Sequence, residues 1–338
     1  MMMHAIGYTR HLPLDDPQSL VQFDLAQPTP TGHDLLVEVA ATAVNPVDLV
    51  GFKRDAPDDD HPAILGWDAV GTVSAVGDAV TLFHPGDRVF YAGDFSRSGS
   101  DTDFQLVDER IVGHAPQTLS TAESAAMPLT ALTAWEALFE QLGIDPHADN
   151  QGQTLLVING AGGVGSVATQ LAHWAGLKVI ATASRPETIA WTKAHGADVT
   201  VNHRQDLVPQ VRALGHQYVD YVLELSNLNQ HWAEIVDLIK PSGKIVSITG
   251  SEVPIDLRAL KQKRATFAWE WMFSKAWFQT ADMVSQHHAL DEISQLLDAG
   301  VLKSTLTKTL TPFTAENLRA ALQLVASHRM MGKAVIER

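Results

Sequence analysis

The chain has 338 residues, 45% hydrophobic and 19% charged, a balance that predicts a folded protein of more than one domain. With 39 acidic against 24 basic side chains, the net charge of -15 makes nucleic acid a poor partner. The absence of cysteine excludes disulfides, thiolate nucleophiles and cysteine-ligated metal sites. The first residues turn polar too early for a secretory signal, and no later stretch is apolar for long enough to span a bilayer, so we expect a cytoplasmic protein with no membrane partner.

The first part of the chain, residues 1–126, is expected to be rich in β-strands. Short apolar runs at residues 35–44, 69–77 and 87–93 are separated by turn-forming glycine, proline and aspartate. The pattern changes at residues 125–139, where apolar side chains recur at helical spacing around Pro128. We therefore expect a domain boundary between residues 126 and 127.

Residues 127–273 are expected to form a parallel α/β domain. Between residues 154 and 203 the chain alternates strand, glycine turn, helix, strand, helix and strand, and the alternation continues to about residue 250. This order predicts a doubly wound sheet of about five or six parallel strands.

An aromatic stripe follows the predicted sheet, and two amphipathic helices occupy the last part of the chain, residues 274–338. In the stripe Phe267, Trp269, Trp271 and Phe273 alternate with other residues and so share one face of a strand. One interpretation is core packing or a dimer edge, and the other is that Trp269 or Trp271 lines an apolar acceptor pocket.

The strongest motif is a GxGxxG turn formed by Gly160, Gly162 and Gly165. It lies directly between an apolar strand and a helix, the context in which such turns bind dinucleotides. The glycines allow a tight turn, close approach of a pyrophosphate and close packing of helix on strand, while the helix presents its free N–H groups to the anion.

The end of the next strand indicates which coenzyme is bound. NAD-binding versions place Asp or Glu there to accept from the ribose 2′-hydroxyl. This chain has Ser184 and Arg185 instead, a hydroxyl and a guanidinium that suit a 2′-phosphate and favour NADPH. His203 and Arg204, after the third strand, extend the cationic pocket, whereas a solvated Arg185 at a helix start is the alternative.

Taken together, these residues resemble the medium-chain dehydrogenase/reductase superfamily, in particular its zinc-free, quinone-oxidoreductase-like branch. The resemblance covers nearly the whole chain. The matching positions are Asn45-Pro46-Val47-Asp48, Gly66, Asp68, Gly71, Val73, Val76, Gly77, Phe83, Gly86, Asp87, Val89, Pro128-Leu129-Thr130, Thr133, Ala134, Trp135, the GxGxxG turn, Asn202-His203-Arg204 and Gly332-Lys333.

The resemblance implies a GroES-like β-rich substrate domain into which a Rossmann domain is inserted, with the last residues returning to the first domain. It also implies which residues hold the coenzyme. The pyrophosphate is placed on Gly162, Gly163 and Val164; the 2′-phosphate on Ser184, Arg185 and His203; and the remaining coenzyme contacts on Thr130, Asn227, Thr249 and Lys333.

The departures from zinc-dependent relatives concern the metal. Those relatives carry a cysteine where Asn45 stands and a histidine where Trp67 stands, together with a four-cysteine lobe that this chain lacks. Because a catalytic zinc needs three such ligands, we expect no metal. The 15 histidines, including His287-His288, show no ligand spacing.

Two features keep alternative readings. Asn45 and Asp48 either orient a substrate or form an ordinary turn, and we carry them as candidate positioning residues with Thr130. The acidic segment 55–61 either binds a cation or is a solvated loop.

The function that the sequence favours is hydride transfer from NADPH to a quinone or an α,β-unsaturated carbonyl compound, without metal. The resemblance implies that the protein is a homodimer. A protein that binds NADPH as a sensor without turnover is one alternative. A zinc-dependent alcohol dehydrogenase is the other.

Overall fold

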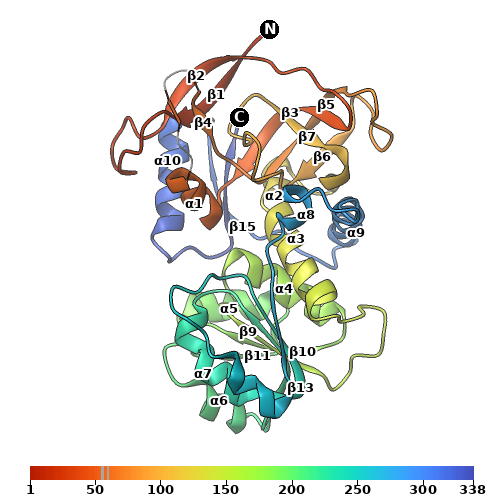
Figure 1. Cartoon of the computed structure of the whole chain (residues 1–338), viewed down its shortest axis with the longest axis vertical. Coiled ribbons are helices and arrows are strands. Elements are labelled where there is room, and N and C mark those ends of the chain that lie inside the picture. Colours follow the sequence, from red (N-terminus) through yellow and green to blue (C-terminus); the bar gives the residue numbers. More distant parts are fainter. Residues whose placement is uncertain (55–56, 59–60) are drawn as a thin grey trace. The chain divides into compact units, whose positions relative to one another are not determined.

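A computed structural model describes residues 1–54, 57–58 and 61–338 of the chain. The chain divides into two compact units (Figure 1). Unit 1 comprises residues 1–132 and 273–338, and unit 2 comprises residues 133–272. The sequence placed the two boundaries after residues 126 and 273.

Unit 1 is built mainly from antiparallel strands. A seven-stranded sheet has the order β15-β16-β3-β5-β6-β8, with β7 also paired to β3, and a three-stranded sheet has the order β2-β1-β4. The strands are β1 (Met2–Tyr8), β2 (Val21–Ala26), β3 (Asp34–Ala43), β4 (Ala63–Ile64), β5 (Ala69–Val76), β6 (Arg88–Tyr91), β7 (Phe104–Asp108), β8 (Val112–His114), β15 (Leu306–Leu310) and β16 (Lys333–Glu337).

The central strand β3 brings together segments that are far apart in the sequence. It pairs with β5 and β7 from the first part of the chain and with β16 from its end. The other elements of this unit are α1 (Pro46–Arg54), η1 (Glu109–Ile111), α2 (Thr121–Ala125), α8 (Ser274–Trp277), α9 (Ser285–Asp298) and α10 (Ala315–Ala326). Helix α3 (Pro128–Trp135) starts in unit 1 and ends in unit 2.

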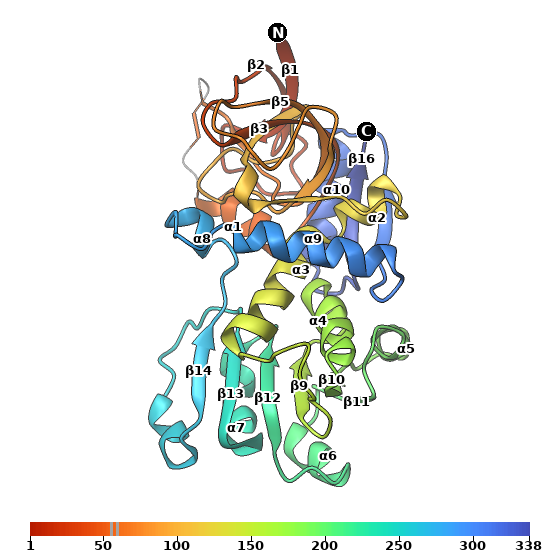
Figure 2. The same ribbon diagram turned by 90° about the vertical axis from the view of Figure 1, so that its right-hand side faces the viewer.

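Unit 2 contains a six-stranded sheet in the order β11-β10-β9-β12-β13-β14, which can be followed in Figure 2. All neighbouring strands are parallel. The strands are β9 (Thr154–Ile158), β10 (Lys178–Thr182), β11 (Val199–Val201), β12 (Val219–Glu224), β13 (Ile239–Ser247) and β14 (Thr266–Trp269). The predicted doubly wound α/β sheet is confirmed.

Helices connect the strands of this sheet because each parallel connection must cross over the sheet. They are α4 (Gly163–Trp174), α5 (Pro186–Ala194), α6 (Leu207–Ala213), α7 (Leu228–Leu238) and η3 (Leu257–Lys263), whereas η2 (Glu136–Gln141) precedes β9. The core beneath α6 and α7 includes Leu156, Val222 and Ile235, all fully buried. Among the described residues, no helix is long and apolar enough to cross a bilayer.

The strand order creates a switch point beside β9. The first strand of the sheet pairs on one side with β10 and on the other with β12. In open parallel sheets, ligands bind beyond the carboxyl ends of the strands at this point. The loops after β9, β10 and β12 are therefore where a coenzyme site is sought.

Candidate coenzyme site and buried polar cluster

The GxGxxG turn joins β9 to α4 at the switch point. Gly162 is the N-cap residue of α4 and offers no side-chain acceptor, so the first N–H groups of the helix are left for a ligand. A Cβ atom at Gly165 would lie 2.1 Å from the carbonyl oxygen of Asn159, a distance that no side chain tolerates. The geometry thus explains why helix and strand meet at a glycine and how an anion gains access to the helix start.

Backbone hydrogen bonds place the ends of three strands side by side. The N–H of Gly160 donates to the carbonyl of Thr182 at 3.0 Å, and the N–H of Ala183 donates to the carbonyl of Val201 at 2.9 Å. The Thr182 hydroxyl also accepts from the N–H of Asn159 at 2.8 Å. The glycine turn, the Ser184-Arg185 segment and the turn that holds His203 therefore follow one another along the same edge of the sheet.

The cationic residues at this edge are partly open to solvent. Ser184, Arg185 and His203 are partly buried, and Arg204 is exposed. Arg185 is the N-cap residue of α5, and its Nε atom lies 2.9 Å from a carboxylate oxygen of Glu187, which is itself exposed. Arg185 therefore stands at a helix start, three residues after the end of β10.

On the other side of β9, a buried carboxylate organises Asn227 and Thr249. Glu224, the last residue of β12, is fully buried and accepts from the N–H groups of Ser226 and Asn227, each at 2.6 Å. Its other oxygen accepts from the hydroxyls of Ser247 at 2.8 Å and Thr249 at 2.5 Å.

Glu224 was not predicted from the sequence. Its only signal is an acidic residue at the end of an apolar strand, which is also common on solvated surfaces. The structure shows that this carboxylate fixes the loops after β12 and β13, and so positions two of the predicted coenzyme residues.

Unit 1 contains a buried polar cluster formed by Asn45, Asp48, Asp68 and Lys333. The Lys333 ammonium donates to Asp68 and to the Val44 carbonyl, each at 2.8 Å, and to the amide oxygen of Asn45. The Asn45 amide nitrogen donates to Asp68 at 2.9 Å. Asn45 and Lys333 are each 1% exposed, so this network is closed to solvent.

Thr130 reaches this cluster only through its neighbour. The second carboxylate oxygen of Asp68 accepts from the N–H of Leu129 at 2.8 Å, in the first turn of α3, where a negative charge is favourable. The Thr130 hydroxyl donates back to the Met127 carbonyl at 3.1 Å, and the residue is 2% exposed.

Asp48 is a member of the cluster whose carboxyl group is buried and whose pKa is raised. Its Oδ2 atom accepts from the N–H of Asn45, whereas Oδ1 is buried without a hydrogen-bond partner in the part of the chain that the structure describes. Burial raises the pKa of Asp48 to about 7, although the Asn45 N–H and Lys333 act in the opposite direction. Burial likewise raises the pKa of Asp101 well above its ordinary value, and the Asp48 charge adds to the effect.

The residues of unit 1 do not fit a catalytic zinc. Asn45 uses its amide oxygen and nitrogen within the polar cluster, next to an ammonium that would repel a metal ion. Trp67 is buried, donates from Nε1 to the Asp94 carbonyl at 3.3 Å and packs against Phe95 at 4.7 Å between ring centroids. Across residues 1–54, 57–58 and 61–338, no three His, Asp or Glu side chains are grouped to hold a metal ion.

The acidic segment and the aromatic stripe are the two other features that the sequence singled out. In the acidic segment 55–61, residues 55–56 and 59–60 lie outside the described residues, and the exposed His61 is paired with Asp58 at 3.0 Å. The aromatic stripe lies partly on β14, the edge strand of the parallel sheet, where Trp269 is 49% exposed. Trp271 follows the strand and is 41% exposed.

Known families and proteins match both parts of the chain. Residues 31–133 match the alcohol dehydrogenase GroES-like domain, and residues 163–286 match the zinc-binding dehydrogenase family. A zinc-type alcohol dehydrogenase-like protein from Staphylococcus epidermidis is 42% identical over 335 residues, 99% of each chain. A 2-methylene-furan-3-one reductase from Solanum lycopersicum is 28% identical, covering 99% of this chain and 79% of that protein.

The fold has a close counterpart among solved structures. A putative zinc-dependent alcohol dehydrogenase from Rhizobium etli has a TM-score of 0.95 and 45% identity, covering 100% of this chain and 98% of that one. The GroES-like first unit, the doubly wound second unit and the identities over almost the full length agree. This chain is a member of the medium-chain dehydrogenase/reductase superfamily of oxidoreductases, which use a nicotinamide coenzyme.

Proposed function

We propose that this oxidoreductase transfers a hydride from NADPH to a quinone or an α,β-unsaturated carbonyl acceptor without a metal ion. The observation that carries the proposal is the edge of the parallel sheet, where Ser184, Arg185 and His203 follow the glycine turn and residues 181–185 hold no carboxylate. A carboxylate there would repel a 2′-phosphate, whereas a hydroxyl and a guanidinium bind it.

The coenzyme would be held by groups that the structure leaves accessible. The pyrophosphate fits against the N–H groups of Gly162, Gly163 and Val164 at the start of α4, where the helix dipole favours an anion. Asn227 and Thr249, fixed by Glu224, would contact the part of the coenzyme that lies toward β12 and β13.

The predicted positioning residues of unit 1 are held in place by a network of buried hydrogen bonds. Lys333 was assigned to the coenzyme, but its ammonium already has three acceptors and is buried. We therefore assign to Lys333 the role of fixing Asn45 and Asp68, and through Asp68 the start of α3 with Thr130. Asn45, Asp48 and Thr130 remain candidates for orienting the acceptor.

The coenzyme supplies the hydride, and the protein holds donor and acceptor together while excluding water. Hydride addition to the β-carbon of an enone leaves an enolate, and a proton from water or a polar side chain completes the product. Such acceptors are already electrophilic, so they need no Lewis acid. This requirement agrees with the buried amide of Asn45 and the buried indole of Trp67, which stand where zinc-dependent relatives keep ligands. The name of the tomato relative, a reductase of an unsaturated ketone, supports the acceptor class.

NADPH oxidation with a panel of quinones and enones tests this proposal. We expect turnover with at least one class, at a rate that chelators do not change. Tight NADPH binding without turnover of any acceptor would favour the sensor alternative. Zinc that copurifies with the protein, together with alcohol oxidation lost on chelation, would favour the alcohol dehydrogenase.

We further propose that the protein is a homodimer paired through β14. Among the residues that the structure describes, β14 pairs with β13 alone, so its outer edge offers unpaired backbone groups. Trp269 on the strand and Trp271 just after it are about half and two-fifths exposed, which is unusual for tryptophan unless a partner covers it. This assigns Trp269 and Trp271 to a subunit contact, whereas Phe267 packs against the core of unit 2 and Phe273 is buried in unit 1.

A further inference from the structure

His203 is an imidazole whose ring nitrogen lacks a partner at the predicted 2′-phosphate site. It lies two residues beyond the end of β11, in the turn before α6. Its Nδ1 atom is buried and makes no hydrogen bond within the described part of the chain. A buried nitrogen of this kind is costly unless a ligand or water completes it.

The groups that lower the pKa of His203 come from three segments. Arg185 stands at the start of α5, Arg204 is its chain neighbour, and His231 lies on α7. Burial, followed by the effects of these three residues, lowers the pKa of His203 below its ordinary value. The free site therefore favours a neutral imidazole at neutral pH.

The nearby carboxylates are engaged elsewhere. Glu187 pairs with Arg185, and Glu234 accepts from His231 at 2.6 Å and from the N–H of Leu207 at 2.7 Å. Asp206 accepts from the N–H of Val208 at the start of α6. None of these hydrogen bonds reaches His203, so an incoming anion is the group that would compensate its charge.

We propose that His203 takes up a proton when the 2′-phosphate binds, so that recognition of NADPH, but not of NADH, depends on pH. This inference rests on the proposed coenzyme. A phosphate monoester dianion beside the ring stabilises the imidazolium and accepts a charge-assisted hydrogen bond from it. Arg185 supplies a constant charge, whereas His203 supplies one that appears only on binding.

The sign of the effect follows from linkage. The affinity for the 2′-phosphate gains from His203 as the pH falls, through the interval between the pKa of the ring in the complex and its lower pKa in the free protein. The 2′-phosphate has its own ionisation near pH 6, and cations favour its dianion, which releases protons. The two contributions oppose one another, so only a comparison with a variant isolates that of the histidine.

Calorimetry of NADPH binding in two buffers of different ionisation enthalpy measures the number of protons taken up. At pH 7 we expect the wild-type protein to take up more protons, by up to one, than His203→Gln. The variant should weaken NADPH binding about tenfold at pH 6 and clearly less at pH 8, with NADH binding unchanged. His173→Gln, at an exposed histidine near the end of α4, is the matched control and should behave as wild type.

The ring itself provides a second readout. In NMR titrations the imidazole signal that is missing in His203→Gln should show a higher pKa with NADPH bound than in the free protein. Equal proton numbers in the two proteins, or an equal loss of affinity at both pH values, would overturn the inference. If the wild-type protein binds no NADPH, the proposed function fails first; if it binds NADPH tightly and only the proton difference is missing, this inference alone fails.

Discussion

The ammonium of Lys333 lies 2.8 Å from the carboxylate of Asp68, and the two side chains are 2% and 0% exposed. The residues are 265 positions apart in the sequence. They meet because β16 and β5 lie on opposite sides of β3 in one sheet. The buried charge pair thereby ties the end of the chain to the segment before β5, and Lys333 also donates to Asn45.

Lys333→Met should destabilise the protein by about 3–5 kcal/mol, because Asp68 would remain buried without its cation. Chemical denaturation measures this loss. The double variant Lys333→Met with Asp68→Asn should lose less than the sum of the single changes. Lys308→Met, at an exposed position of β15, is the control and should change stability by less than about 0.5 kcal/mol. A loss that small for Lys333→Met would contradict the role of the pair.

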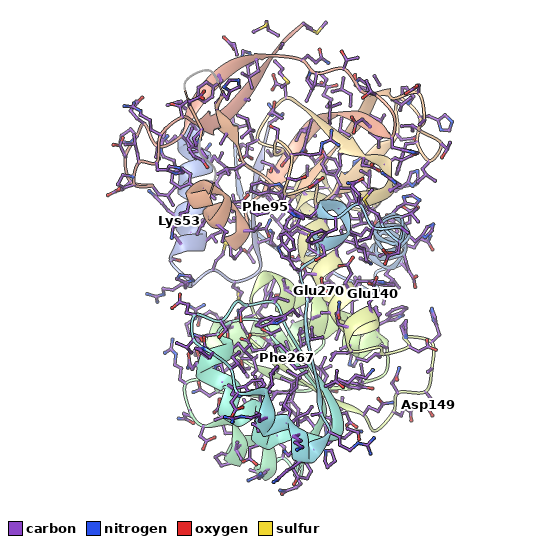
Figure 3. All side chains as sticks on the ribbon, viewed as in Figure 1. Lys53, Phe95, Glu140, Asp149, Phe267 and Glu270 are labelled. Carbon is purple, nitrogen blue, oxygen red and sulfur yellow. The ribbon has the colours of Figure 1, made fainter. Side chains whose placement is uncertain are left out.

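Glu270 and Glu136 form a pair of buried, hydrogen-bonded carboxyl groups in unit 2. Glu140 lies near Glu270, and both are labelled in Figure 3. Burial and the charge of Glu136 raise the pKa of Glu270 well above its usual range. The folded chain thus keeps a proton that the unfolded chain loses above about pH 4.3. The resulting stability is complete below that pH and is lost as the pH rises toward the pKa of the folded state.

Glu270→Gln should therefore reduce the fall in melting temperature between about pH 6 and pH 9. Glutamine keeps a hydrogen-bonding group in the same place and cannot ionise. We expect the variant to gain on the order of 1 kcal/mol relative to wild type at the higher pH, about 2–4 °C. If the melting temperatures of the two proteins fall equally across this pH range, the pair of carboxyl groups does not hold a proton.

Gly165→Ala should disrupt the coenzyme turn, because the added Cβ atom would lie 2.1 Å from the Asn159 carbonyl oxygen. The glycine turn and the start of α4 would have to separate, which typically costs about 1–3 kcal/mol. We expect weaker NADPH binding together with lower thermal stability. Gly250→Ala is the matched control, since a Cβ atom there meets nothing within 4 Å. Equal behaviour of the two variants would refute the close approach.

Trp269→Lys should convert a dimer into monomers, because a charge at the centre of a β14 pair would be buried without compensation. Light scattering coupled to size-exclusion chromatography gives the mass directly. Phe278→Lys replaces another exposed aromatic residue, in unit 1 and 68% exposed, and should leave the mass unchanged. A dimer that survives Trp269→Lys would place the subunit contact elsewhere.

The parallel sheet was predictable because its signal is local. Each strand and helix from β9 to β13 has its own periodicity, and the GxGxxG turn marks the first crossover. The doubly wound sheet followed from these patterns, whereas the GroES-like domain and the superfamily followed from the resemblance, and all three are confirmed. The extent of β14 was less clear, since only Thr266–Trp269 of the predicted stripe pairs with β13.

The charge networks were not predictable because their partners are distant in the sequence. Lys333 was assigned to the coenzyme by resemblance, and nothing near it in the chain indicates Asp68 or Asn45. Glu136 starts η2 and Glu270 directly follows β14, yet their pairing depends on how these elements pack. Local patterns locate elements, whereas tertiary contacts determine which polar side chains are buried together.

The central claim is that the end of β10 selects a phosphorylated ribose. Titration calorimetry of the wild-type protein and Arg185→Ala with both reduced coenzymes tests it most directly. The account predicts that NADPH binds the wild-type protein at least about tenfold more tightly than NADH, and that the variant loses this preference without losing affinity for NADH. NADH binding as tightly as NADPH in the wild-type protein, or an unchanged preference in the variant, would contradict it.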